Sequence, residues 1–156
     1  MSDDALIGMA YQRVGADLFG AENLRAKLLT RGPDERAFFT LVACGAEIDN
    51  GGVSQLFFNS TGELIYEVIA GAEHFGLDRH AAILREATLL FPGGNVPLDW
   101  EEREAAWNVL CEEADAAGDD ELDERISALD KRWYALAEEL ETRLAVYARV
   151  NLAAGA

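Results

Sequence analysis

The sequence predicts an all-α protein, folded as a single compact multi-helix domain with no significant β-sheet. Three observations support this prediction. Apolar residues recur at helical spacing along most of the chain, no segment alternates apolar and polar residues with the period of a strand, and glycine, proline and capping residues separate the helical stretches. The chain has 156 residues, of which 50% are hydrophobic, enough to bury one substantial core. We therefore assign residues 1–156 to one domain.

The first 30 residues carry a weaker helical pattern than the rest of the chain. Its apolar positions are Leu6, Met9, Ala10, Val14 and Leu18 and, after a break at Gly20, Leu24 and Leu28. We expect residues 1–30 to form a helical extension that packs on the remainder.

Several helix ends are marked in the middle of the chain. Pro33, followed by Asp34 and Glu35, is typical of a helix start, because proline fits the first turn and acids favour its positive dipole end. The pair Ser60 and Glu63 has the spacing of a capping box. The same spacing recurs at Asp99 and Glu102, and the following helix is expected to turn five apolar residues inward: Trp100, Trp107, Leu110, Cys111 and Ala114.

The final third has the most regular apolar repeat. Its members are Leu122, Ile126, Leu129, Trp133, Leu136, Leu140, Leu144 and Tyr147. Steps of three and four residues predict either one long helix or two helices joined near Asp130. The repeat is favoured as an intramolecular core face, and the alternative is the interface of a homodimer.

The segment from Asn50 to Ser60 combines two glycines, side-chain amides and a Leu-Phe-Phe run. Glycine ends helices readily because it adopts left-handed backbone angles. We predict a structural elbow in which the amides bridge backbone groups freed between two helices. The alternative is a small polar pocket. The residues of this structural motif are Glu47, Asn50, Gly51, Gly52, Gln55, Phe57, Phe58 and Asn59.

No catalytic residues are assigned, because no nucleophile stands with a general base in a recognisable pattern. His74 and His80 lack partners at metal-ligand spacing, so we expect surface or capping roles for them and predict neither a metal nor a cofactor. Cys44 and Cys111 lie among apolar neighbours and are expected to be buried, reduced thiols. The acidic start, with Asp3 and Asp4, and the lack of a long apolar run favour a cytoplasmic protein without membrane association.

Acidic residues are concentrated in one part of the chain, whose formal net charge is -16. Residues 1–98 hold 13 acids and 7 bases, residues 99–141 hold 16 acids and 4 bases, and residues 142–156 hold two bases and no acid. The three net charges are therefore -6, -12 and +2. Such a charge disfavours direct binding to nucleic acid and favours a basic partner.

Ten acids in this region are candidate partner-binding residues. They are Glu101, Glu102, Glu112, Glu113, Asp115, Asp119, Asp120, Glu121, Asp123 and Glu124. Carboxylates three or four residues apart on a helix lie about 5 to 6 Å from each other, a spacing comparable with that of successive phosphates in a nucleic-acid strand. The alternative is an ordinary solvated face that keeps the protein soluble.

The order of several motifs resembles that of the bacterial acidic DNA-mimic protein family, which is otherwise catalogued as a domain of unknown function. The motifs are Glu47-x-x-Asn50-Gly51-Gly52-x-x-Gln55-x-Phe57-Phe58-Asn59-Ser60-x-Gly62, then Gly71-Ala72, Ala81-Ala82-Ile83, Phe91-Pro92, Leu129-Asp130-x-Arg132-Trp133-Tyr134 and Tyr147. The resemblance covers residues 35–151. It implies an all-helical, dimeric acidic protein that occupies the DNA-binding face of a transcription regulator.

From charge and resemblance together, we expect a non-enzymatic binding protein whose partner is a basic DNA-binding protein. An immunity or antitoxin-like protein that neutralises a basic toxin is the alternative, since it would have the same size and charge. A small-ligand-binding protein or an uncharacterised enzyme is the third class. It would require a pocket around Glu47, Asn50, Gln55 and Asn59.

Overall fold

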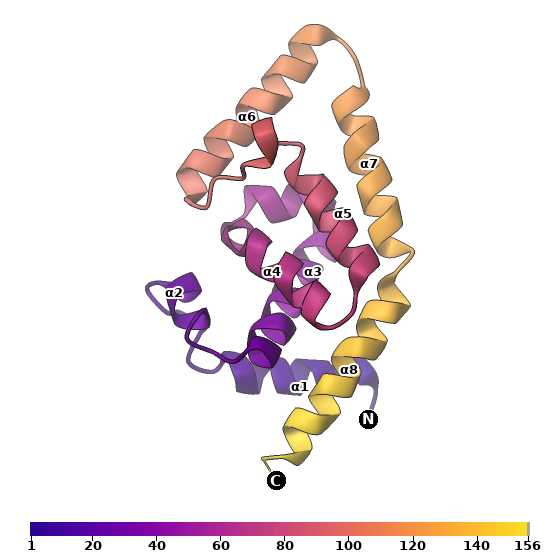
Figure 1. Ribbon diagram of the computed structural model, residues 1–156. Coiled ribbons are helices and arrows are strands. Elements are labelled where there is room, and N and C mark those ends of the chain that lie inside the picture. The colour runs from indigo at the N-terminus through magenta and orange to yellow at the C-terminus, as the bar shows by residue number, and fades with distance from the viewer. Residues whose placement is uncertain (156) are drawn as a thin grey trace.

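The structure is a computed structural model that describes residues 1–155, and over that range it is all-helical, which confirms the predicted fold class (Figure 1). The α-helices are α1 (Asp3–Gly15), α2 (Leu24–Leu28), α3 (Pro33–Phe58), α4 (Ile65–His74), α5 (Asp78–Thr88), α6 (Trp100–Ala117), α7 (Glu121–Tyr134) and α8 (Ala137–Ala153). Two short 3-10 helices, η1 (Ser60–Leu64) and η2 (Pro92–Gly94), lie between them.

Helix α3 is the centre of the molecule and contacts α1, α4, α6, α7 and α8. Its side chains Phe38, Leu41, Ile48, Leu56 and Phe57 are fully buried. Helix α4 lies closest to it, because Gly71 has no side chain: a Cβ there would lie 2.8 Å from the Ala37 Cα. The core therefore surrounds α3.

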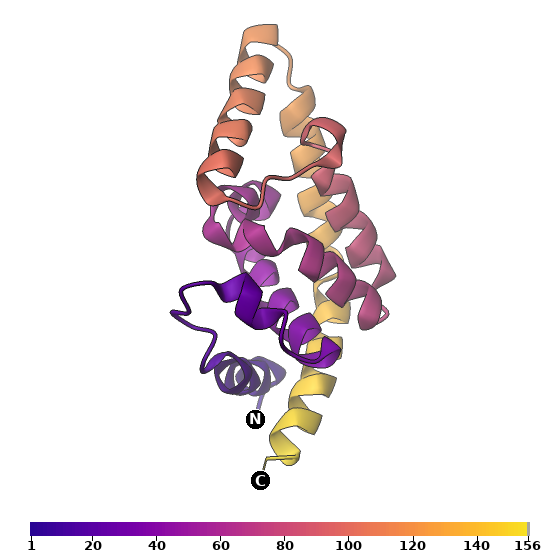
Figure 2. The same ribbon diagram turned by 60° about the vertical axis from the view of Figure 1, so that its left-hand side comes forward.

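Both chain termini lie at one end of the molecule, where α1 packs against α8 (Figures 1 and 2). Arg13 donates a 2.8 Å hydrogen bond to the Asn151 carbonyl, and Arg149 forms an ion pair with Asp3. At the other end, α6 and α7 form a helical hairpin that projects from the rest of the chain.

The helix ends agree with the local signals in two of three places. Pro33 is the first residue of α3, and the Asp99 carboxylate accepts a 2.9 Å hydrogen bond from the Glu102 amide at the start of α6. The capping box predicted at Ser60 and Glu63 is wrong. Ser60 begins η1 and makes no capping hydrogen bond, because the chain completes a 3-10 turn before α4 starts.

The apolar repeat of the final third belongs to two helices. They meet at Ala135 and Leu136, five residues beyond Asp130, where the Leu136 amide donates to the Trp133 carbonyl over 2.9 Å. The repeat continues in register across this junction, so periodicity alone does not locate it. Four members of the repeat, Leu129, Trp133, Leu140 and Leu144, are buried within the chain's own core. This agrees with the favoured interpretation of the repeat as an intramolecular core face.

Candidate partner-binding surface

All ten candidate acids lie on the projecting α6–α7 hairpin, and all ten are exposed. We call residues 99–124 the acidic hairpin and its outer part, residues 108–124, the hairpin tip. The acidic hairpin contains twelve acids and one base, Arg103, and the tip contains eight acids and no base. The formal net charge of the whole acidic hairpin is therefore -11.

Eight of the seventeen acids outside the acidic hairpin form an ion pair, whereas none of the twelve hairpin acids does so within the described residues. Over the described residues 1–155, every ion pair uses acids outside the acidic hairpin. The pairs join Arg25 to Glu67, Lys27 to Asp17, Arg31 to Asp17 and Glu35, His74 to Asp34, Arg79 to Glu139, Arg85 to Glu73, Arg132 to Glu86 and Arg149 to Asp3. The hairpin carboxylates thus present uncompensated charge to solvent.

Arg103, the one base in the acidic hairpin, is fully buried and points away from the acidic surface. Its guanidinium donates to the carbonyls of Phe57 at 2.8 Å and Asn59 at 2.6 Å, and to those of Pro97 and Leu98 at 3.1 and 3.0 Å. Burial lowers the pKa of Arg103, while Glu63 and Asp99 oppose that shift. The side chain joins the base of the hairpin to the end of α3. Sequence reasoning missed this role, although Arg103 stands four residues before the buried Trp107.

The local folding of the hairpin places acids at both ends of α6. Glu101 and Glu102 lie in its first turn, where the helix dipole favours negative charge. Asp115 lies in the last turn, which has no base, and there the dipole opposes a carboxylate. Gly118, with φ +65°, ends the helix, and Asp119 accepts a 3.2 Å hydrogen bond from the Glu121 amide. Asp115 therefore does not serve helix stability, whereas Glu121, Asp123 and Glu124 lie in the first turn of α7, where the dipole favours them.

The hairpin tip contributes little to the core. No residue between Trp107 and Leu129 is fully buried, and the half-buried Leu110, Leu122 and Ile126 pack against the core. The base of the hairpin is firmer, because the Trp107 ring lies 5.7 Å from the Phe57 ring. The hairpin is thus fixed at its base and exposed along its acidic length.

Two aromatic residues beside the acids are exposed. Trp100, predicted to face inward, is 49% exposed, and Phe58 of the Leu-Phe-Phe run is 44% exposed, whereas Leu56 and Phe57 are buried. The Trp100 indole donates a 2.8 Å hydrogen bond to the Phe58 carbonyl. The periodicity of α6 places Trp100 on the same face as Trp107. It does not show that the first turn of α6 extends beyond the helices that bury Trp107. Aromatic side chains of this kind are common anchors in protein interfaces.

The predicted elbow is present within α3, where Gly51 and Gly52 have non-helical backbone angles. Gly52 has φ +75° and ψ -176°, a conformation that only glycine adopts readily. The amides of Gln55 and Asn59 each donate 2.8 Å hydrogen bonds to Glu47, which corrects the expectation that they bridge backbone groups. A carboxylate one helix turn before the elbow accepts both amides at once, so the motif forms a side-chain cluster instead.

The elbow also holds α7 in place. The Val53 amide, freed by the kink, donates a 2.8 Å hydrogen bond to Asp130 of α7. Trp133 donates to Asp49 over 3.1 Å, and the Tyr134 hydroxyl donates to the Ile48 carbonyl over 2.9 Å. One arm of the acidic hairpin therefore rests on the elbow.

The histidines and cysteines lie in four separate environments. His74 is exposed beside Asp34, at 2.6 Å, as a surface role requires. His80 corrects the prediction: it is fully buried, its ring meets that of Trp133 edge-on at 5.1 Å, and burial lowers its pKa. Cys44 is buried and Cys111 half-buried, both as free thiols, and burial raises the pKa of each.

Two further observations concern metals and membranes. In the described part of the chain, no three His, Cys, Asp or Glu side chains gather in a way that could hold a metal ion. Over residues 1–155, none of the helices combines the length and apolar character that a bilayer crossing requires.

The family model described as DMP19-like protein matches residues 32–151, close to the range 35–151 expected from the motifs. No curated protein and no solved structure matches the chain.

Proposed function

The chain belongs to the DMP19-like protein family, a family of DNA mimics, and we propose that it is a non-enzymatic acidic protein whose hairpin occupies the DNA-binding surface of a basic protein. The observation that carries this proposal is the unpaired charge of the acidic hairpin. Residues 99–124 hold twelve acids and a single base, which is buried.

The energetic cost of clustering these acids supports a role in partner binding more than a role in solubility alone. Like charges one helix turn apart each cost a few tenths of a kcal/mol, and Asp115 adds an unfavourable interaction with the α6 dipole. Solubility requires no such concentration, because charge spread over the molecule serves equally well. A basic surface that normally binds phosphates would offset these costs and would be attracted over a long range.

The exposed aromatic pair adds a second kind of contact at the base of the hairpin. The Trp100 indole is fixed by its hydrogen bond to the Phe58 carbonyl, so Trp100 loses little side-chain entropy when a partner covers it. The face of a tryptophan ring attracts arginine, which is abundant in DNA-binding surfaces. A basic DNA-binding protein therefore matches both the charged and the aromatic parts of this surface.

The test is competition with DNA. The immobilised protein is exposed to native cell extract, and captured proteins are then eluted with duplex DNA or with salt. The proposal expects a captured protein that itself binds DNA, that duplex DNA displaces, and whose affinity falls steeply with salt. A partner that duplex DNA does not displace would refute mimicry. A captured nuclease whose activity is inhibited would instead support the immunity alternative.

A charge-reversal pair gives the matched control. The hairpin variant carries Glu112→Lys, Glu113→Lys, Asp120→Lys and Glu121→Lys. The control variant carries Asp4→Lys, Glu22→Lys, Glu138→Lys and Glu141→Lys, at exposed positions outside the acidic hairpin. Both change the net charge equally, and circular dichroism checks their helix content. Capture should be lost only in the hairpin variant. Equal loss in both would show that net charge alone, without the hairpin, accounts for binding.

A further inference from the structure

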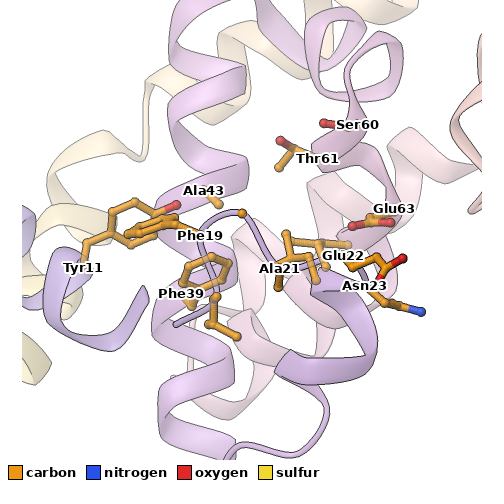
Figure 3. Close-up of a pocket in the computed structure, with 14 residues that line it drawn as sticks. Tyr11, Phe19, Ala21, Glu22, Asn23, Phe39, Ala43, Ser60, Thr61 and Glu63 are labelled. Carbon is orange, nitrogen blue, oxygen red and sulfur yellow. The ribbon is translucent and has the colours of Figure 1, made fainter. Parts of the chain in front are cut away.

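A cavity of about 550 Å³ lies far from the hairpin tip, between the α1–α2 connection, α3 and η1 (Figure 3). This volume falls within the range of small-molecule sites, about 300 to 1,000 Å³. One wall is aromatic. The Tyr11 ring stacks on Phe39 at 5.1 Å and meets Phe19 edge-on at 5.3 Å, and Phe19 is 43% exposed.

The opposite wall carries side-chain oxygen atoms from η1. Ser60, Thr61 and Glu63 lie across the cavity from the three rings, as Figure 3 shows. The Thr61 hydroxyl donates to Glu47 over 3.4 Å. The side chains lining the cavity include no lysine and no arginine.

Glu63 is the charged group of this wall, and neighbouring cations are engaged elsewhere. Arg25 pairs with Glu67 at 2.6 Å, and Arg103 donates to backbone carbonyls. Burial raises the pKa of Glu63, while Arg103 and Arg25 act in the opposite direction and Glu67 reinforces the rise. A half-buried carboxylate without an ion-pair partner gains from a ligand that carries a positive charge.

We propose that this cavity binds a small organic ammonium, with the charged nitrogen at Glu63, Ser60 and Thr61 and the apolar part against Tyr11, Phe19 and Phe39. Aromatic faces attract cations and cover apolar groups, and a carboxylate with hydroxyls accepts the ammonium hydrogens. An anion or phosphate ester finds no cationic partner among the lining side chains. The site is independent of the acidic hairpin and of the function proposed for it.

The test uses phenethylammonium chloride as the probe and 2-phenylethanol as its neutral analogue of similar shape. Two-dimensional NMR of the full-length protein measures affinity and locates the site. We expect roughly millimolar binding for so small a probe, with shifts at Thr61 and Ala43, and at least tenfold weaker binding of the alcohol. Glu63→Gln should lower the affinity for the probe at least tenfold.

Two controls separate this site from general attraction to an acidic protein. Glu141→Gln, at an exposed position outside both the cavity and the acidic hairpin, should leave probe affinity unchanged, and Phe19→Leu should weaken the binding of both the probe and the alcohol. Thermal unfolding checks that each variant folds. Equal binding of probe and alcohol, unchanged affinity in Glu63→Gln, or shifts confined to the hairpin would each overturn the proposal.

Discussion

The body of the molecule, meaning the residues outside the acidic hairpin, contains carboxylates paired with arginines, whereas the hairpin carboxylates are unpaired. In the body, arginines meet carboxylates across helix boundaries, as Arg25 does with Glu67 and Arg149 with Asp3, while apolar side chains fill the space around α3. In the hairpin tip, eight acids have no base among them, and no residue is fully buried. The difference separates the part that stabilises the fold from the part that is available to a partner.

The two regions are joined at few points, so substitutions at the junction should have the largest effects. Arg103→Met removes the donors that satisfy the carbonyls of Phe57 and Asn59. Leaving buried polar groups unpaired costs about 1 to 3 kcal/mol each, so we expect a loss of about 3 kcal/mol in the free energy of unfolding, measured in urea. Arg125→Met, at an exposed position in α7, should change it by less than about 0.5 kcal/mol. Similar losses of unfolding free energy in both variants would show that Arg103 does not join the hairpin to the rest of the fold.

The elbow gives the next largest effect. Gly52→Ala forces a side chain into a conformation that costs about 1 to 3 kcal/mol, and the added Cβ would overlap the Asp130 carboxylate. We expect a loss of about 2 kcal/mol on urea unfolding. The control, Gly8→Ala, lies inside α1 with open space around it and should gain up to about 1 kcal/mol. If both substitutions were neutral, the elbow would not depend on glycine.

The smallest effect tests the hairpin itself. Asp115→Lys, in the last turn of α6, should raise stability by about 0.3 to 1 kcal/mol, because a cation favours that end of the dipole. Glu101→Lys, in the first turn, should lower it by a similar amount for the same reason. Both should weaken partner capture. Capture retained by Asp115→Lys together with higher stability would mean that this acid has no binding role.

The sequence predicted two features that depend on local chemistry. Asp99 caps α6 and Gly52 makes the elbow because each effect involves residues within one helix turn. The exposure of the ten acids was also predictable, since carboxylates without buried partners stay in water. Their lack of ion pairs was not, because pairing depends on which arginines the fold brings near.

The buried polar residues show the limit of such reasoning more sharply. Arg103 and His80 are fully enclosed, although residues of these types are more often found at least partly exposed. In the core, Arg103 is stabilised by carbonyls from a segment more than 40 positions away in the chain. The sequence near residue 103 contains no pattern that predicts these partners. The exposure of Trp100 was missed for a related reason, because it depends on where α6 extends beyond its neighbours.

The hydrogen bond between Val53 and Asp130 bears on how the protein folds. It joins residues 77 positions apart, and closing a loop of that length costs about 4 kcal/mol of chain entropy. A hydrogen bond to a carboxylate contributes only about 1.5 to 3 kcal/mol, too little to close the loop alone. Trp133 and Tyr134 contact α3 through the same closure, so these contacts share its cost. We therefore expect the kink and the docking of α7 to stabilise each other, since their contacts share one loop closure.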